Sequence, residues 1–282
     1  MNDLIIHVFH TGEVCVAPAL PFGGDCGILK ASGIFEKKSH RLWLPVSAYL
    51  IESKQGRILF DCGWHRDMSP DGVYDEKAQI KSLGSLALYK INQGRIGKGQ
   101  AINEQLETMG IKPNDLDYVL LSHLDCDHAN GLKLISEAKH ILVSKDELAF
   151  SQKGLTNRIR YNKDWWEGTK LETFDWNGQE GPVYKSYDLF GDGHFMMINI
   201  PGHSDGLCAL KITNDEGRYV LLYSDGGYST KSWKEQIPSG IAANREEQKA
   251  SLVWIKEMSE DPNCVESLAN HDANVFPHTI TL

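Results

Sequence analysis

Short apolar runs alternate with polar segments along the chain and predict a protein of mixed strands and helices. Strands are expected near residues 4–16, 46–52, 58–60, 118–121, 140–143, 183–189, 196–200, 208–212, 219–223 and 265–269. Helices are expected over residues 101–109, 131–138 and 245–258. Two sheets of this kind, each flanked by helices, predict an α/β fold in the form of a four-layer αββα sandwich built from two similar halves.

Two segments interrupt this pattern, at about residues 18–42 and 64–100. The remainder of the 282 residues fits a single domain over residues 1–282, with these segments as long loop excursions beside the strand ends. Long ordered loops in enzymes often form pocket walls, so substrate selectivity is expected there. The aromatic residues in the excursions suit either an acyl-chain pocket or a homodimer interface: Phe22, Phe35, Trp64 and Tyr89.

Four His and Asp side chains follow the apolar run 118–121 within six residues: His123, Asp125, Asp127 and His128. A loop leaving the carboxyl end of a strand can turn successive side chains toward one point, and imidazole and carboxylate groups are metal ligands. The same residues could instead cap a helix that starts near Ala129, since Asp is a good N-cap residue. The segment alone leaves both interpretations open.

Three later apolar segments favour the metal interpretation because each runs into a His or an Asp. These residues are His203, Asp225 and His271. If the three strands share a sheet, their ends lie side by side and the ligands gather along one edge. The predicted ligand set is His123, Asp125 and His203 on one side, Asp127, His128 and His271 on the other, and Asp225 between them.

This order of motifs resembles the metallo-β-lactamase superfamily, in which H-x-H-x-D-H is followed by a lone His, a lone Asp and a last His. The resemblance extends over most of the chain, since residues 44–52 and 58–63 resemble the first two strands and the D-x-G turn of these domains. Within the superfamily, the chain is most similar to the N-acyl homoserine lactone lactonases, which carry a Tyr three residues after the bridging Asp, as Tyr228 follows Asp225. The resemblance implies two divalent metal ions, with zinc as the first expectation.

Asp125 stands where the superfamily motif has His. A third carboxylate would leave the loaded site one charge unit less positive than usual. Oxygen ligands suit harder ions, so manganese and iron are alternatives to zinc. The shorter side chain leaves open whether the first ion shifts, binds weakly or is missing. A carboxylate at this position also resembles the diiron oxygen-reducing branch of the superfamily, which has Glu there.

The resemblance implies a dinuclear metal-dependent hydrolase that opens a small lactone or ester. A metal-bound hydroxide oriented by Asp127 or Asp225 would attack the carbonyl, and the Tyr228 hydroxyl would help to stabilise the oxyanion. The alternatives are a hydrolase of the same fold acting on a thioester, phosphodiester or β-lactam, and a redox diiron or degenerate metal-binding protein.

Residues 202–206, with the sequence Gly-His-Ser-Asp-Gly, match the G-x-S-x-G pattern of serine hydrolases and raise a rival mechanism. Asp225 and His271 follow in the order of a catalytic triad. A nucleophile elbow needs a helix directly after it, however, whereas residues 207–212 predict a strand. The serine mechanism also leaves the cluster at residues 123–128 unexplained.

Two further residues near the cluster have predicted roles. Asp61, in the D-x-G turn, is expected either to hydrogen-bond a ligating imidazole or to serve only as a turn residue. Cys126 lies inside the cluster but is expected to pack away from the ions. The six cysteines lack C-x-x-C pairing and are expected to be free thiols.

Charge and hydropathy limit the partners. The formal net charge of −9, without a cluster of Lys and Arg, argues against a nucleic-acid partner. No apolar run approaches the length of a membrane span, and the first residues lack the basic start of a secretory signal. We therefore expect a cytoplasmic enzyme that acts on a small molecule.

Overall fold

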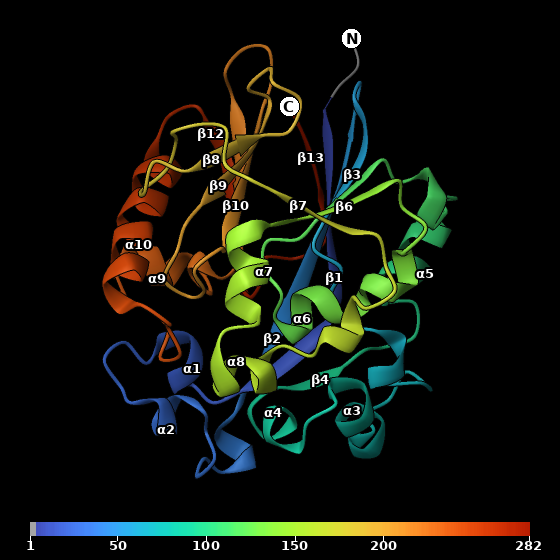
Figure 1. Ribbon diagram of the computed structural model, residues 1–282, viewed down its shortest axis with the longest axis vertical. Coiled ribbons are helices and arrows are strands. Elements are labelled where there is room, and N and C mark those ends of the chain that lie inside the picture. The colour runs from blue at the N-terminus through green and yellow to red at the C-terminus, as the bar shows by residue number, and fades with distance from the viewer. Residues whose placement is uncertain (1–3) are drawn as a thin grey trace.

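The computed structural model describes residues 4–282 and contains two sheets packed between helices (Figure 1). The larger sheet has the order β13 (Thr279–Thr281), β1 (Ile5–Val16), β2 (Leu42–Ser53), β3 (Gly56–Phe60), β5 (Tyr118–Leu120), β6 (His140–Ser144) and β7 (Leu171–Phe174), and β4 (Gln93–Arg95) also pairs with β1. The smaller sheet has the order β12 (Cys264–Leu268), β11 (Tyr219–Leu222), β10 (Cys208–Thr213), β9 (Phe195–Asn199) and β8 (Ser186–Asp188). The predicted αββα sandwich is confirmed.

The helices cover the outer faces of the sheets and fill the connections. They are α1 (Ala19–Phe22), α2 (Ile28–Ala31), α3 (Glu76–Leu83), α4 (Leu86–Ile91), α5 (Ile102–Thr108), α6 (Cys126–Ala129), α7 (Lys145–Ser151), α8 (Gly154–Arg160), α9 (Thr230–Lys234) and α10 (Arg245–Glu260). None of the helices within residues 4–282 is long and apolar enough to cross a membrane.

Alternation along the strands separates the core into layers. In β5, the side chain of Leu120 packs in the cluster between the two sheets, whereas its neighbour Val119 packs in the cluster beneath the helices. In β11, Leu222 and Leu221 divide between the inner and outer clusters in the same way. Successive side chains point to opposite faces of these central strands, and both faces are buried, as expected for sheets covered on both sides.

The strand directions bring the carboxyl ends of three strands to one edge of the smaller sheet. Strand β10 is antiparallel to both β9 and β11, and β12 is parallel to β11, so β9, β11 and β12 all run the same way. The prediction that these three strands share a sheet is confirmed. Strand β5 lies in the other sheet, and the backbone N–H of Cys208 donates to the carbonyl of Ser122 (2.9 Å), which ties the two sheets together beside the strand ends.

The predicted helix over residues 131–138 is wrong. Helix α6 already begins at Cys126, and residues Asn130–Ile135 form a 3₁₀-helix. Asp127 and His128 therefore lie within a helix and do not precede one that starts near Ala129. Asp125 occupies the N-cap position of α6, but its side chain makes no capping hydrogen bond. The capping interpretation does not account for Asp125.

The two excursions are not simple loops. Residues 18–42 include α1 and α2, and residues 64–100 include α3, α4 and β4. Of their aromatic residues, Trp64 and Tyr89 are buried in an apolar cluster with Tyr228, and Phe22 packs against the same cluster. Phe35 is 86% exposed, so the four aromatic residues do not all gather at one place.

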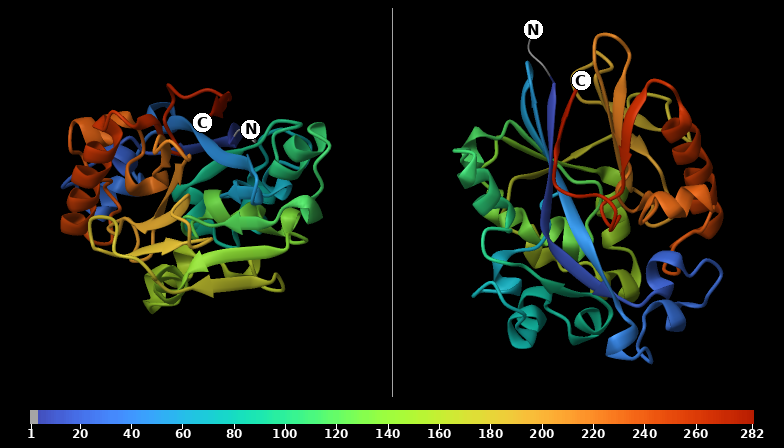
Figure 2. Two further views of the ribbon diagram at one scale, coloured as in Figure 1. Left: turned by 90° about the horizontal axis from the view of Figure 1, so that it is seen from above. Right: turned by 180° about the vertical axis from the view of Figure 1, so that it is seen from behind.

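The two halves are also less similar than predicted. The chain returns at its end to the larger sheet, where β13 pairs with β1, so the last strand lies beside the first (Figure 2). The sequence patterns further missed α7, α8 and β7, which together span residues 145–174.

Candidate metal centre

All seven predicted ligand side chains meet at the strand ends. They fall into three overlapping groups whose ligand atoms lie within 4.8 Å of one another: His123, Asp125 and His203; His123, His128 and Asp225; and Asp127, His128 and His271. Asp125 and Asp127, each 7% exposed, are the most accessible of the seven, and the other five are 0–2% exposed. The structure thus assembles the complete predicted set from both sheets.

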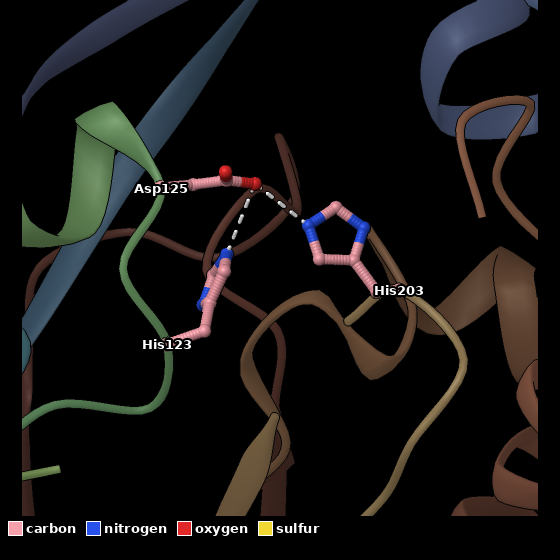
Figure 3. A group of neighbouring side chains, drawn as sticks. All are labelled: His123, Asp125 and His203. Carbon is pink, nitrogen blue, oxygen red and sulfur yellow. Dashed lines mark hydrogen bonds and ion pairs between the residues drawn. The ribbon is translucent and has the colours of Figure 1, made fainter. Parts of the chain in front are cut away.

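The first group is arranged around the carboxylate of Asp125. Its Oδ2 atom lies 3.3 Å from Nε2 of His123 and 2.9 Å from Nε2 of His203, so that the carboxylate points between the two imidazoles (Figure 3). These separations are compatible with three ligands converging on one ion.

Asp225 lies between the two sides of the cluster, as predicted. Its Oδ1 atom is 3.3 Å from Nε2 of His128 and 3.2 Å from Nε2 of His271. Its Oδ2 atom is 3.6 Å from Nε2 of His203 in the first group. One carboxylate therefore reaches both sides.

Several of these buried ligand atoms have no hydrogen-bond partner among residues 4–282: Nε2 of His123, His128 and His271, and Oδ1 of Asp225. Buried polar atoms without partners are rare and costly in folded proteins. Imidazole nitrogens and carboxylate oxygens are ligands of zinc and other divalent ions, so coordination would satisfy all of them. The donor set fits a divalent metal centre.

Three of the imidazoles are oriented through Nδ1. Nδ1 of His271 donates to the carbonyl of Pro45 (2.8 Å), and Nδ1 of His128 pairs with Oδ2 of Asp61 (2.8 Å). Nδ1 of His123 lies 2.9 Å from the hydroxyl of Ser122. Each contact leaves Nε2 facing the cluster, which is how metal-binding imidazoles are commonly fixed. The imidazole contact predicted for Asp61 is present.

The segments that carry Asp61 and Asp225 hold unusual backbone conformations. Asp61 has a φ of 61°, and Ser224, directly before Asp225, has a φ of 46°. Non-glycine residues in this left-handed region are strained and persist where surrounding contacts fix them. Asp61 is fixed in this way, because its carboxylate also accepts the backbone N–H and the hydroxyl of Ser122.

Arg160, at the end of α8, is a functional candidate that the sequence analysis missed. Its Nε and Nη2 atoms donate to Oδ1 and Oδ2 of Asp125, both at 2.6 Å, and 18% of its side chain is exposed. Burial alone would raise the pKa of Asp125, but Arg160, His123 and His203 together hold it well below its usual range. A carboxylate that is buried beside other ligand residues needs a nearby cation to offset its charge. This chemical requirement is the signal by which a partner for Asp125 could have been sought.

The sequence analysis did not foresee the charge that Arg160 contributes. In this structure the negative charge of Asp125 is offset by the guanidinium bound to it. The net charge of the metal-loaded site stays a prediction, because it depends on whether the guanidinium keeps this position when an ion binds.

His203 also contacts Arg160. Nη2 of Arg160 lies 2.7 Å from Nε2 of His203, and Nη1 donates to the His203 carbonyl at 3.2 Å. Burial and the guanidinium lower the pKa of His203 to about 4. The ring is therefore neutral at neutral pH, with Nε2 able to accept the Arg160 hydrogen bond.

Ser204, the nucleophile of the rival serine mechanism, has a structural role. Its fully buried hydroxyl donates to Oε2 of Glu147 (2.6 Å), whose Oε1 accepts the backbone N–H of Leu124 (3.0 Å). Glu147 of α7 thereby joins the loop that carries His123 to the loop that carries His203. Burial raises the pKa of the Glu147 carboxyl group. The segment after Ser204 leads into strand β10 and not into a helix, so it is not a nucleophile elbow.

Replacing Ser204 with alanine tests this assignment. The Ser204→Ala variant should unfold more easily by about 1–3 kcal/mol, because Glu147 loses a buried hydrogen bond. The folded variant should keep its hydrolytic rate. Loss of turnover in protein that unfolds like the wild type would instead support the serine mechanism; denaturant melts and initial rates on the same samples provide the comparison.

Tyr228 lies against the second side of the cluster. Its ring stacks on His271 with centroids 5.1 Å apart, and the residue is 4% exposed. Burial and the carboxylates of Asp225 and Asp127 raise the pKa of Tyr228 well above its usual value. Its hydroxyl therefore stays protonated and able to donate a hydrogen bond.

Cys126 belongs to none of the ligand groups found within residues 4–282, but it does not pack away from the ligands. Its thiol donates to Oδ1 of the ligand residue Asp127 at 3.8 Å and accepts a hydrogen bond from the Asn92 amide at 3.5 Å. Its side chain lies in the apolar cluster that contains Trp64 and Tyr228.

Comparison with known families agrees with this arrangement. The model of the metallo-beta-lactamase superfamily matches residues 41–216, more than half of the 282-residue chain. The chain belongs to the metallo-beta-lactamase superfamily. The matched region of this superfamily member includes the 123–128 cluster and His203, while Asp225 and His271 lie beyond it.

Named relatives of this superfamily member include lactonases. The chain is 26% identical over 248 residues to the N-acyl homoserine lactonase AttM of Azorhizobium caulinodans, covering 83% of this chain and 84% of the relative. It is 27% identical over 187 residues to the AttM protein of Rhizobium radiobacter, covering 64% of each chain. It is also similar to the probable metallo-hydrolase Rv2300c of Mycobacterium tuberculosis, with 26% identity over 262 residues, which cover 89% of this chain and 76% of that protein.

A solved structure has the same fold. It is an N-acyl homoserine lactone hydrolase with the product N-hexanoyl-L-homoserine bound at its catalytic metal centre. The two chains superpose with a TM-score of 0.74 over 99% of this chain and 100% of that chain, at 22% sequence identity. The resemblance recognised in the motifs is confirmed, and so is the fold.

Proposed function

We propose that this chain is a metal-dependent hydrolase that opens the ring of small lactones, with N-acyl homoserine lactones as the first substrates to test. The observation that carries the proposal is the buried cluster of seven ligand residues with unpartnered imidazole and carboxylate atoms. The lactonase names of its relatives support the choice of substrate. Zinc is the first metal to test, with manganese and iron as alternatives.

The ligand groups divide the proposed centre between two positions. His123, Asp125 and His203 would hold one divalent ion, and Asp127, His128 and His271 the other, with Asp225 shared between them. When bound, such ions polarise a carbonyl group and lower the pKa of water toward neutrality. This chemistry removes the need for a serine or cysteine nucleophile.

The chain's own residues would direct the reaction. Asp127 and Asp225 accept hydrogen bonds from the attacking water and orient it toward the lactone carbonyl carbon. The Tyr228 hydroxyl donates to the carbonyl oxygen as negative charge develops there. Addition of the water oxygen to the carbonyl carbon moves the π electrons of the C=O bond onto the carbonyl oxygen. When the C=O bond forms again, the ring C–O bond breaks, and the proton lost by the water passes to the released alkoxide, which leaves a hydroxy acid.

Tyr228→Phe is expected to lower kcat by roughly 10- to 10²-fold with little change in KM, because the lost hydrogen bond strengthens only as the oxyanion forms. Metal content should be unchanged, since the Tyr228 hydroxyl belongs to none of the ligand groups described. Steady-state kinetics on one lactone measures both constants. An unchanged kcat would remove Tyr228 from the proposed machinery.

A substrate panel tests the reaction class. The metal-loaded protein would be assayed on N-acyl homoserine lactones of several acyl lengths, and on a thioester, a phosphodiester and a chromogenic β-lactam. We expect kcat/KM for at least one lactone to exceed the others by about 10²-fold or more, as for a site shaped for its own substrate. Preference for another member of the panel would replace the lactone assignment while keeping the metal centre.

The proposal also covers the setting of the enzyme. It is a single metallo-hydrolase domain in the cytoplasm, acting without a nucleic-acid partner. All six cysteines are free thiols, which suits a reducing compartment, and the net charge of −9 disfavours phosphate backbones. A homodimer stays a prediction for solution measurements.

A further inference from the structure

The two sides of the ligand cluster differ in how their atoms are partnered. Within residues 4–282, Nε2 of His128, Nε2 of His271 and Oδ1 of Asp225 have no hydrogen-bond partner. In the first group Nε2 of His123 likewise has no partner, but both oxygens of Asp125 and Nε2 of His203 contact the guanidinium of Arg160. A cation is therefore already present on one side only.

The position of that cation coincides with the space between two ligand atoms. Nη2 of Arg160 lies 2.6 Å from Oδ2 of Asp125 and 2.7 Å from Nε2 of His203, while the two ligand atoms are 2.9 Å apart. A guanidinium only donates hydrogen bonds, so its contact with Nε2 of His203 requires the neutral ring to carry its proton on Nδ1. In this tautomer Nε2 has a single lone pair, which either accepts an N–H or binds a metal. Arg160 and a divalent ion therefore compete for His203.

The guanidinium is held firmly. It forms a two-pronged pair with Asp125, donates to the His203 carbonyl (3.2 Å) and lies 5.0 Å from the centre of the Tyr161 ring. Arginine stays charged in proteins, so it cannot yield the site by losing a proton. An ion entering the first group must displace the guanidinium or share Asp125 with it.

We propose that Arg160 is a built-in competitor of the first metal ion, so that this chain loads its two positions unequally. One ion binds tightly through Asp127, His128, His271 and Asp225. The ion at His123, Asp125 and His203 binds more weakly, by on the order of 10²-fold, because its entry breaks a largely buried Arg–carboxylate pair. This inference rests on the metal centre of the proposed function and is independent of its substrate.

Metal titration without substrate tests the proposal. Metal-free full-length protein would be titrated with Co²⁺ by calorimetry, with the visible absorption of the bound ion recorded in parallel. We expect the wild type to bind one tight equivalent and a second about 10²-fold more weakly. In Arg160→Gln the two dissociation constants should lie within about 10-fold of each other. The exposed Arg158 of the same helix provides the matched control, and Arg158→Gln should titrate like the wild type.

Two equivalents of similar affinity in the wild type would overturn the proposal, and so would a weak equivalent that is unchanged in Arg160→Gln. If Arg160→Gln does not fold, the double variant Asp125→His with Arg160→Met removes the competitor and restores a neutral ligand, and it carries the same expectation. His203→Ala should keep the tight equivalent and His271→Ala should lose it; the reverse pattern would contradict the assignment of the two positions.

The titration and the substrate panel fail independently. Unequal loading together with no lactone turnover would leave the proposal about Arg160 standing and remove the substrate assignment. Equal loading together with lactone turnover would overturn the proposal about Arg160 and leave the substrate assignment standing.

Discussion

Asp225→Asn is expected to abolish tight metal binding and to reduce lactone hydrolysis by more than about 10²-fold. Loss of residues that merely support metal ligands already costs about 10- to 100-fold in metal affinity or activity. The substitution of Asp225 should lower both quantities further, because its two oxygens face both sides of the cluster. Oδ1 lies 3.2 Å from Nε2 of His271, and Oδ2 lies 3.6 Å from Nε2 of His203. Metal content after gel filtration and initial rates at saturating metal measure the two effects.

A carboxylate from the neighbouring loop is the matched control. Asp205 is exposed, pairs with Lys153 at 3.6 Å and follows shortly after His203. Asp205→Asn should bind metal and turn over substrate like the wild type. If Asp225→Asn retained a full complement of metal, Asp225 would not be a ligand and the division of the centre into two sides would be wrong.

Asp125→Ala should destabilise the metal-free protein by about 3–5 kcal/mol, the usual cost of leaving a largely buried charge without its partner. The charge in question is the Arg160 guanidinium, which keeps only 18% of its side-chain surface exposed. The double variant Asp125→Ala with Arg160→Leu should recover much of this loss, since no unpaired charge remains. Urea unfolding of the wild type, both single variants and the double variant gives the coupling free energy.

An exposed pair serves for comparison in the same experiment. Lys163 and Glu167 lie 3.2 Å apart with 73% and 61% of their side chains exposed, so Glu167→Ala should change the stability little. A similarly small effect of Asp125→Ala would mean that Arg160 is well solvated without its partner. It would then present little competition to a metal ion.

The fold was largely predictable because the strands are apolar on both faces and end at recognisable residues. The runs at 118–121 and 219–223 place Leu120 and Leu222 between the sheets. What could not be predicted is the pairing of distant segments. The return of β13 to β1 depends on residues 279–281, whose sequence Thr-Ile-Thr is too short to carry a pattern.

The ligands were predictable because each follows a strand. The ends of β9, β11 and β12 meet at one edge of the smaller sheet, and the segment after β5 reaches them from the larger sheet. The residues that support the first ligand group could not be predicted in this way. Arg160 and Glu147 lie on short helices within residues 145–160, a stretch without clear hydrophobic periodicity. Arg158 and Arg160 are equivalent candidates in the sequence, and only the fold shows which one reaches Asp125.

The contact with Arg160 changes what the Asp125 substitution implies for the charge of the site. Considered alone, the substitution suggested harder metals and a likeness to diiron proteins. In the structure, both oxygens of the carboxylate are engaged by a guanidinium, so Asp125 with Arg160 carries the net charge of the neutral His that it replaces. In the proposed centre, the preference between zinc and harder ions would depend mainly on the other side of the cluster, where His128 and His271 would provide nitrogen ligands.

Lactone opening is predicted to depend on metal held by this cluster. The most direct measurement follows ring opening of N-hexanoyl homoserine lactone by mass spectrometry, using protein stripped with chelator and then supplied with zinc or manganese, with His271→Ala alongside. We predict that stripped wild type is inactive and recovers on adding metal, and that His271→Ala does not recover. Full activity in the stripped protein, or equal recovery in His271→Ala, would contradict the account.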